Sequence, residues 1–596
     1  PERHLIINQL LKQMSISKTP GVYVKEISKF PPSVAGVATA IPVFIGFTEK
    51  CADANKNVPT PISSLLDYEE KFGKSCKLVI DSGELKNKEF VMYNSMRLYF
   101  DNGGGNCYVV SVGQYGENGE NVINLKREAG TYTSCTKALE KVDEITLLVY
   151  PDAAMILNAT NLATVHQAAL KHCYEMGDRF AILDIAGNGN EAIKEFRREI
   201  GMNHLNFGAA YYPNLKTTYS SEIDLQEMMK IETIANAIKD SGITESSSDF
   251  SACFDYSKVI PNLKKEYEEQ KKALEAKKTM FEALNGLSDA AKIIEFIVEN
   301  GITTDLQNEF HEKSSEANPY QKDIESITGK IADVGDFTID GQGNIQWNGV
   351  GDKDMVIYND IKAAKNSFAK IMEDKQQELT VYVNTIKANV PAYSAKLAEL
   401  QEEAAVITPS AAIAGLYCAN DNNVGVWQAP ANVSIASVSA VTTLLSDNDQ
   451  DTLNVDASAG KSINAIRYFA GKGIMVWGAR TLDGNSNEWR YIPVRRLFNY
   501  VEESVKKSTS WAVFQPNDAN TWTKIQCQIE SFLNNLWRDG ALAGDKPEKA
   551  FYVRVGLGVT MTADDINNGL LYVEIGMAAV RPAEFIVLKF SHKMQE

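Results

Sequence analysis

The sequence predicts a multi-domain α/β protein in which mixed sheets, flanked by helices, carry a large and mostly helical insertion. The first observation is a β-α-β order, in which a helix at 161–177 separates two continuous apolar runs. The second is a shift between 216 and 408 to a composition rich in Lys, Glu, Gln and Ala. The third is a strand-like run near each end of the chain that has no hairpin partner.

The two terminal runs are TPGVYVKEI at 19–27 and EFIVLKF at 584–590. Neither faces another strand across a tight turn. Because an unpaired strand leaves an exposed edge that proteins normally cover, both runs are expected to pair with a partner outside their local sequence.

The region between the first run and residue 113 contains several predicted elements. A double proline at 31–32 breaks regular structure, and residues 41–47 then form a buried strand. Residues 64–73 are typical of a short helix. Residues 95–113 predict a helix, a tight turn at DNGGG and a strand.

The β-α-β unit lies next. Continuous apolar runs at 145–152 and 180–185 predict buried strands on either side of the helix at 161–177. FGAAYYPNL at 207–215 supplies a further strand. This order predicts a parallel sheet that is covered on both faces.

The insertion has apolar residues at heptad spacing. Tyr267, Leu274 and Phe281 recur at seven residues, and Leu263 and Leu284 extend the same face. A second long helical region is marked by Ile361, Phe368, Leu379, Tyr382, Ile386 and Leu397. Together with the tip sequence FTIDGQGNIQWNG, these regions predict a helical hairpin with a small β-rich tip, either a solvated decorating domain or a domain that binds a partner.

The C-terminal third returns to an α/β pattern. A strand is predicted at 472–482 and another at 511–516. One helix face is marked by Val494, Leu497, Phe498, Val501 and Val505, and a second by Ile525, Ile529, Phe532, Leu533 and Leu536. FYVRVG, LLYVEIGMAAV and EFIVLKF then predict three closing strands.

Charge and cysteine usage exclude some classes of function. A net charge of -17 argues against a general nucleic-acid binder, which needs a basic face. The eight cysteines include no CxxC pair, so free thiols in a reducing compartment are expected rather than a zinc cluster. PERHLIINQLLKQM is too short and too polar for a signal peptide, and no long apolar run occurs, so the protein is expected to be made in the cytoplasm.

The motif that most resembles a chemical site is ASAGKS at 457–462. Gly460, Lys461 and Ser462 fit the end of a phosphate-binding loop, but Val455 stands where its first glycine is needed. A polar stretch also replaces the strand that should precede it, so a loop opening a helix over SINAIRYF is expected. An α/β nucleotide-binding enzyme that uses Gly460–Ser462 is the alternative function.

No other catalytic, cofactor or metal site can be assigned from the residues. His166 and His172 lie six apart on one predicted helix, which does not give the shared face that a metal pair needs. The remaining histidines, His4, His204, His311 and His592, form no motif. The protein is therefore predicted not to be an enzyme and to need no cofactor.

Long stretches of the sequence resemble one family. TPGVYVKEI with AIPVFIGFTE, FDNGGGNCYVVSVG, AAYYPNL, GKGIMVWGARTL, EWRYIPVRRLFNYVEESVKKSTSWAVFQPND and MTADDINNGLLYVEIGMAAVRPAEFIVLKF are similar to contractile tail sheath proteins of phages and phage-tail-like contractile injection systems. The resemblance covers about 19–217 and 409–592, and is best for single-chain sheaths of extracellular-type systems. It does not cover 218–408, and the family's short LNPxGIN is expanded here to LNVDASAGKSIN, so the GKS motif lies in an enlarged structural loop.

The resemblance implies a division into domains. It predicts an N-terminal arm at 1–27, an N-terminal sheath region at 28–113, a central α/β sheath domain at 114–217 and 409–482, an outward-facing helical insertion domain at 218–408, a C-terminal inner sheath domain at 483–583 and a C-terminal strand arm at 584–596.

The resemblance also implies a function. A sheath subunit polymerises helically around an inner tube and contracts from a metastable extended state without nucleotide. Each terminal arm would add a strand to a neighbouring subunit, through Val22, Tyr23, Val24, Lys25, Glu26 and Ile27, and through Phe585, Ile586, Val587, Leu588, Lys589 and Phe590. The helix that contacts the inner tube would carry Arg495, Arg496, Asn499, Glu502, Glu503, Lys506 and Lys507.

The implied partners are neighbouring sheath subunits in rings of six-fold symmetry, the inner tube, baseplate and cap proteins, and a disassembly ATPase, with no direct nucleic-acid contact and no membrane insertion. Such a particle is assembled in the bacterial cytoplasm and is then released or anchored at the cell envelope. A surface protein whose insertion binds a host factor is a third hypothesis.

Overall fold

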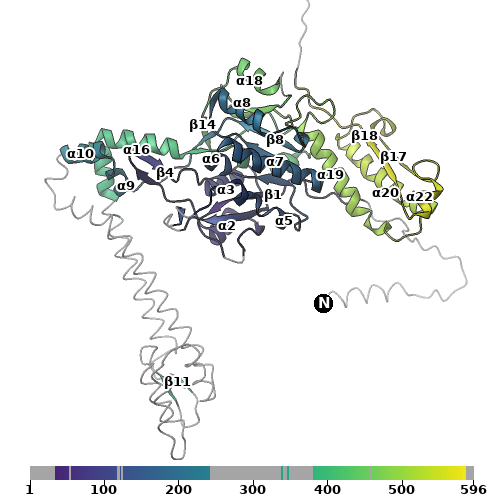
Figure 1. Ribbon diagram of the computed structural model, residues 1–596, viewed down its shortest axis with the longest axis horizontal. Coiled ribbons are helices and arrows are strands. Elements are labelled where there is room, and N and C mark those ends of the chain that lie inside the picture. Colours follow the sequence, from purple (N-terminus) through teal and green to yellow (C-terminus); the bar gives the residue numbers. More distant parts are fainter. Residues whose placement is uncertain are drawn as a thin grey trace, which may run out of the picture. The chain divides into compact units, whose positions relative to one another are not determined.

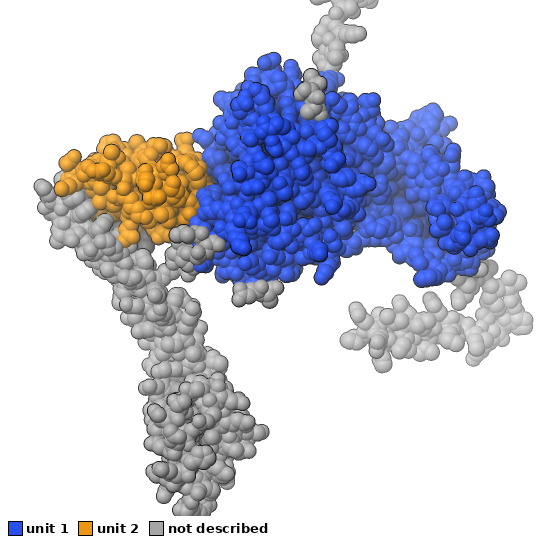
Figure 2. Space-filling view, viewed as in Figure 1, with its two compact units in different colours: residues 1–76, 89–219, 406–596 blue, residues 77–88, 220–405 orange. Residues whose placement is uncertain are grey.

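The computed structural model describes residues 34–52, 55–116, 121–122, 125–241, 337–339, 345–347, 377, 380–456 and 460–585. The chain divides into two compact units, coloured separately in Figure 2. The first comprises Pro1–Cys76, Glu89–Tyr219 and Val406–Glu596, and the second Lys77–Lys88 and Ser220–Ala405. None of the helices within these described ranges has the length and apolar character needed to cross a membrane.

A nine-stranded mixed sheet forms the centre of the first unit (Figure 1). In spatial order its strands are β13 (Val433–Ser434), β16 (Gly473–Trp477), β15 (Ile463–Phe469), β8 (Gly208–Tyr212), β7 (Phe180–Asp184), β6 (Leu147–Val149), β1 (Pro42–Thr48), β5 (Cys107–Gln114) and β2 (Thr60–Ile62). The strands from β15 to β5 run parallel, whereas β13 and β16 at one end and β2 at the other pair antiparallel. The predicted mixed sheet with a parallel β-α-β centre is therefore confirmed.

Both faces of this sheet are covered by helices. Along β1, Val43 and Ile45 enter the core formed with α7 (Ala159–Met176) and α8 (Gly189–Glu199). Phe44, on the opposite face, enters the core formed with α3 (Met92–Asp101) and α17 (Ser410–Asn423). Because side chains alternate along a strand, the apolar residues of β1 fill two separate cores.

The ends of α7 follow from local chemistry. The Asn158 side chain accepts a hydrogen bond from the Asn161 backbone N–H and so caps the first turn. At the other end Gly177 adopts a left-handed φ of 80°, which ends the helix at little steric cost. The predicted helix at 161–177 is thus confirmed; it begins two residues earlier and ends one residue earlier than expected.

A second sheet, of three strands, lies where the chain leaves the first unit for the insertion and returns from it. β9 (Leu215–Thr217) lies between β12 (Val406–Ile407) and β14 (Val438–Val441), antiparallel to both. In this register Lys216 is opposite Val406, so the chain leaves and re-enters the first unit at adjacent positions. Shorter elements of the unit are α2 (Leu65–Phe72), α4 (Ala129–Thr133), α5 (Thr136–Leu139), α6 (Ala153–Ile156), η3 (Leu205–Phe207) and α18 (Asp447–Asn454).

The second unit is built from β3 (Val79–Asp81), β4 (Glu84–Lys86), α9 (Leu225–Met229), α10 (Glu232–Asp240) and α16 (Pro391–Ala404). Of the apolar residues predicted to mark its second helical region, Tyr382, Ile386 and Leu397 are buried in its core. The antiparallel pair β10 (Phe337–Ile339) and β11 (Ile345–Trp347) confirms strands in the predicted tip. The heptad positions Leu263, Tyr267, Leu274, Phe281 and Leu284, together with Ile361, Phe368 and Leu379, lie outside the described residues.

The C-terminal part of the first unit combines two long helices with a two-stranded sheet (Figure 1). Its elements are α19 (Ile492–Ser508), η5 (Ser510–Ala512), α20 (Ala519–Arg538), α21 (Pro547–Ala550), β17 (Phe551–Val555), α22 (Ala563–Asn567) and β18 (Val573–Met577). Leu497 and Val501 of α19 pack with Ile529 and Leu533 of α20, as the helical spacing predicted.

Two local predictions are wrong. SINAIRYF is the strand β15, because its alternating residues Ile463 and Ala465 fill one core while its backbone pairs with β8 and β16. WAVFQP is not a strand: Ser510–Ala512 form one 3-10 turn after α19, and no strand of the described chain pairs with the residues that follow.

Candidate functional site

The sheet of β17 and β18 has one apolar and one polar face. Phe551 is opposite Met577 and Val553 is opposite Ile575, and these side chains pack against the core shared with α20. On the other face the Tyr552 hydroxyl donates to Glu574 at 2.8 Å. One face of the sheet is therefore buried within the chain.

Both outer edges of this sheet carry outward-directed backbone groups. The Ala578 N–H donates to the Ala550 carbonyl at 2.8 Å, and Ala550 is the residue before β17. Because hydrogen-bonded pairs alternate along an antiparallel ladder, positions 552 and 554 face β18, and positions 574 and 576 face β17. The backbone groups of 551, 553 and 555 on β17, and of 573, 575 and 577 on β18, therefore point outward.

Among the residues that the structure describes, no further strand joins either edge. The one side-chain bond on the β17 edge is long: Gln526 Nε2 donates to the Val553 carbonyl at 3.4 Å. A sheet of two strands is marginal by itself. This sheet is thus a candidate acceptor for added strands.

The start of the C-terminal run is anchored to the central domain through Glu584. Arg480 makes a bidentate ion pair with this carboxylate, with Nε 2.9 Å from Oε1 and a terminal nitrogen 2.6 Å from Oε2. Asn454 Nδ2 donates to Oε1 at 2.7 Å, and the Tyr491 hydroxyl donates to Oε2 at 3.2 Å. Burial by itself raises the pKa of Glu584, but these hydrogen bonds outweigh it and lower the pKa below its ordinary value. We call Arg480, Asn454, Tyr491 and Glu584 the arm-root cluster.

Sequence reasoning missed this cluster. Arg480 closes a predicted strand and Glu584 opens another, but the two lie 104 positions apart and no local pattern links them. Phe585, the next residue, is 70% exposed and lies outside regular structure. The rest of the predicted strand, Ile586, Val587, Leu588, Lys589 and Phe590, and the N-terminal positions Val22, Tyr23, Val24, Lys25, Glu26 and Ile27, lie outside the described residues.

The loop at Gly460–Ser462 does not have the geometry of a phosphate site. A strand follows it rather than a helix, so no helix N-terminus can receive a phosphate. Lys461 is 3% exposed, and its ammonium group donates to the Arg197 carbonyl. The Ser462 hydroxyl donates to the Asn454 carbonyl at 2.6 Å. The groups that would hold phosphate and magnesium are bonded to the protein backbone, so the described part of this loop gives no support to the nucleotide-binding alternative.

The two arginines predicted to contact the inner tube lie in the interior. Arg495 Nε donates to Asn499 Oδ1 at 2.7 Å, and the Arg495 guanidinium lies 4.1 Å from the centre of the Trp489 ring. Arg496 forms a bidentate ion pair with Asp421, at 2.6 and 3.0 Å. Both side chains are thus bound within the chain.

The remaining residues of that predicted set differ in exposure. Asn499 and Glu503 are buried, and Asn499 Nδ2 donates to the Arg179 carbonyl at 3.1 Å. Glu502 and Lys506 have side chains that are 55% and 72% exposed, and Lys507 is also exposed. These three residues are the part of the set that is accessible in this conformation.

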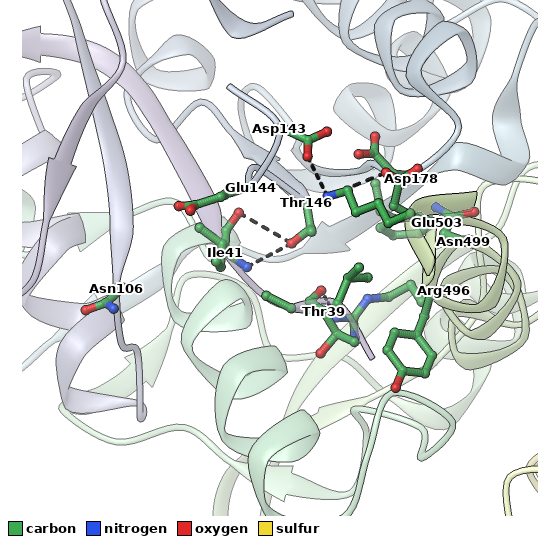
Figure 3. Close-up of a pocket in the computed structure, with 15 residues that line it drawn as sticks. Thr39, Ile41, Asn106, Asp143, Glu144, Thr146, Asp178, Arg496, Asn499 and Glu503 are labelled. Atoms are coloured by element: carbon green, nitrogen blue, oxygen red, sulfur yellow. Dashed lines mark hydrogen bonds and ion pairs between the residues drawn. The ribbon is translucent and has the colours of Figure 1, made fainter. Parts of the chain in front are cut away.

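Asp143, Asp178 and Glu503 line a cavity of about 400 Å³ (Figure 3). Lys507 also lines this cavity. The Lys507 ammonium lies 2.6 Å from Asp143 Oδ2 and 3.5 Å from Glu503 Oε1. Burial raises the pKa of Asp178, while Arg179 opposes this shift. The carboxylates of Asp143, Asp178 and Glu503 could offer ligands to a cation. The ammonium group of Lys507, which lies on α19 with Glu503, already supplies a positive charge there.

Buried titratable groups elsewhere hold the fold together. Asp184 accepts from the Ser410 N–H at 3.0 Å and from the Ser410 hydroxyl at the start of α17, and burial raises its pKa to about 7. Burial lowers the pKa of His166 to about 3. Burial and the neighbouring Arg179 lower that of His172 to about 4. Both histidines are therefore neutral residues of the interior.

Comparisons with known proteins agree with this architecture. The phage tail sheath C-terminal domain matches residues 485–593, which include the two-stranded sheet of β17 and β18. The tail sheath protein of Vibrio phage KVP40 is 28% identical over 124 residues, and this match covers 21% of the present chain and 18% of the phage protein.

Two solved structures are similar over nearly the whole chain. One is the baseplate of the anti-feeding prophage, reconstructed with 6-fold symmetry, and the other is the helical sheath of the same particle in the contracted state. In each case the identity is 25%, the TM-score is 0.52, and the alignment covers 97% of this chain and 100% of the other. The domain match identifies residues 485–593 as a phage tail sheath C-terminal domain, and over nearly its whole length the chain is similar to the helical sheath of the anti-feeding prophage.

Proposed function

We propose that this chain is a structural subunit that polymerises helically around an inner tube and contracts from a metastable extended state, driving the tube through a target envelope. The observation that carries the proposal is the two-stranded sheet β17–β18, whose outer edges are unpaired in the described chain and which lies inside the matched sheath domain.

The open sheet and the terminal arms complement one another. Each subunit offers two edges and contributes two strand-like runs, at 22–27 and 585–590. Strand addition between subunits would satisfy the outward backbone groups, and alternate side chains would fix the register. Since each subunit gives to one neighbour and accepts from another, the contact propagates as a helix rather than closing between two copies.

Strand addition also suits a contracting lattice. A run of this length makes about four or five backbone hydrogen bonds, each contributing about 0.5–1.5 kcal/mol. Such a strand contact can persist while the two subunits that it connects rotate relative to one another. Energy stored at assembly can then be released as new interfaces form, without hydrolysis of a nucleotide.

The inner tube is the proposed partner of α19. Of the residues predicted for this contact, Glu502, Lys506 and Lys507 are accessible, whereas Arg495, Arg496, Asn499 and Glu503 brace the interior. Exposed ion pairs contribute only about 0–1 kcal/mol each, so a contact of this kind can break during contraction.

The further partners that we propose are neighbouring sheath subunits in six-fold rings, a baseplate, a terminal cap and a disassembly ATPase. The particle would assemble in the bacterial cytoplasm and then be released or be anchored at the envelope. The insertion at 218–408 would face outward, and the division at 27, 113, 217, 408, 482 and 583 remains the proposed domain organisation.

Electron microscopy of the purified chain tests the proposal. The full chain, alone or co-expressed with its inner tube protein, should form wide hollow tubes or rings. Chains lacking 1–27 or 585–596 should remain monomeric with an unchanged far-ultraviolet circular dichroism spectrum. A full chain that stays monomeric even with the tube protein would overturn the function, and truncated chains that still assemble would overturn the role of the arms.

A further inference from the structure

We propose that Arg480 is a positioning residue for the C-terminal arm: by clamping Glu584 it makes residues 585–590 leave the subunit from one fixed point on the central domain. This inference rests on the proposed function, because the point of departure matters only if the arm reaches a neighbouring subunit.

The clamp uses the full hydrogen-bonding capacity of one carboxylate. Glu584 Oε1 accepts from Arg480 Nε and Asn454 Nδ2, and Oε2 accepts from an Arg480 terminal nitrogen and the Tyr491 hydroxyl. The planar guanidinium fits a carboxylate in one orientation, so a bidentate pair fixes direction as well as distance. With Arg480 only 4% exposed, solvent screens this pair little.

Arg480 is itself attached to the central sheet. Its backbone N–H donates to Asn464 Oδ1 at 2.8 Å, and Asn464 Nδ2 donates back to the Arg480 carbonyl at 2.8 Å. Asn464 is a buried residue of β15, the third strand from one end of the nine-stranded sheet. The position of Glu584 is therefore set by buried residues of the central sheet.

The enlarged loop that contains the GKS motif supports the same clamp. The carbonyl of Asn454 accepts from Arg480 at 3.2 Å and from the Ser462 hydroxyl at 2.6 Å. Lys461 holds the end of the loop through the Arg197 carbonyl. These bonds keep Asn454 where its side chain can reach Glu584, which gives a structural role to a motif that resembles a nucleotide site.

The chain on either side of Glu584 has few attachments. Val580 donates its N–H to the Ala541 carbonyl at 3.2 Å and is the last residue tied to the C-terminal sheet region. Of the described residues 581–585, Arg581, Ala583 and Phe585 are exposed, and Glu584 is the one whose side chain the structure shows bonded. The start of the arm is therefore attached to the central sheet, through Glu584, rather than to β18.

The rate at which a glutamate-specific protease cleaves after Glu584 measures release from the clamp, because the protease must bind the free Glu584 carboxylate. We expect Arg480→Met in the full chain to speed removal of 585–596 at least about tenfold, since hydrogen bonds to charged groups of this kind correspond to about one decade or more in an equilibrium. Cleavage after the exposed loop residue Glu488, followed by mass spectrometry, is the internal reference. Arg198→Met, on the exposed face of α8, is the matched control and should leave the rate unchanged.

Assembly is the second measurement. Arg480→Met should slow tube formation at least about tenfold while the melting temperature of the monomer stays within a few degrees of wild type. Arg480→Lys retains the charge but not the bidentate geometry, so its assembly should also be slow although its melting temperature matches that of the wild type. If Arg480→Met does not fold, Tyr491→Phe removes one donor and should still accelerate cleavage.

The outcomes separate the two proposals. Unchanged cleavage after Glu584 in both variants would refute the clamp. So would fast cleavage in Arg480→Met with wild-type assembly, provided that deletion of 585–596 abolishes tubes. If that deletion also assembles normally, the proposed role of the C-terminal arm fails instead.

Discussion

A proline at the first residue of β18 should block assembly without unfolding the subunit. The Val573 N–H points away from β17, so Val573→Pro removes no bond of the internal ladder. Proline is tolerated at the start of a strand, and its ring would occupy the edge where an incoming strand must lie. The matched control is Glu574→Pro, one residue further on, whose N–H faces β17.

The magnitude follows from the edge itself. An arm that forms four or five hydrogen bonds along 573–577 gains about 2–7 kcal/mol in total at about 0.5–1.5 kcal/mol each. Val573→Pro removes at least one of these bonds, which weakens each joint by about two- to tenfold. Because every subunit in a helical lattice repeats the joint, the concentration needed for assembly should rise by more than this.

Light scattering and electron microscopy at increasing concentrations measure this threshold, and thermal melting checks the monomer. Val573→Pro should stay monomeric at concentrations where the wild type forms tubes, with a nearly unchanged melting temperature. Glu574→Pro should melt earlier, since it breaks an internal ladder bond and also removes the carboxylate that accepts from the Tyr552 hydroxyl. Wild-type assembly by Val573→Pro, with its circular dichroism spectrum intact, would show that the β18 edge receives no strand.

Three further predictions concern the subunit itself. Arg496→Met leaves Asp421 buried without its bidentate partner, so urea denaturation should give a loss of about 3–5 kcal/mol, and a loss within experimental error would contradict the pairing. Burial raises the pKa of Asp184 to about 7 in the folded protein, so its contribution to stability is fully present below pH 4 and is lost as the pH rises through 7. Asp184→Asn should therefore flatten the plot of unfolding free energy against pH between these values. An unchanged slope would refute the assignment. Glu584 has a lowered pKa, so the arm-root cluster contributes stability that is present above the unfolded pKa and is lost as the pH falls through the folded value; the stability measured by urea denaturation should therefore fall less on acidification in Glu584→Gln than in the wild type, and equal slopes would argue against the assignment.

The central sheet could be predicted from sequence because its strands are continuous apolar runs separated by a periodic helix. Local pattern failed where a distant partner decides the structure. The polar loop before SINAIRYF does not predict a strand. The segment forms β15 because β8 and β16 pair with it on either side. WAVFQP has strand-like residues but no partner strand among the described residues, and it forms a turn between two helices.

The charged residues of the predicted site show the same limit. Arg495 and Arg496 stand on the polar side of a helical pattern, which predicts exposure, yet both are buried. Asp421, which neutralises Arg496, lies 75 positions away, and Glu584 is still further from Arg480. Ion pairs of this kind depend on the finished fold, so neither helical spacing nor charge patterning reveals them.

The antiparallel contact between β9 and β12 makes the insertion a site at which one folded domain could be replaced by another. Lys216 and Val406 are paired neighbours, so a connection of a few residues could replace 220–405 without stretching the chain. Because the entropy of loop closure grows only logarithmically with length, a foreign folded domain with close termini could occupy the same place at a cost of about 1 kcal/mol or less. A particle built from this subunit would then carry one copy of a chosen enzyme, tag or binding domain per sheath position, introduced at a single genetic site.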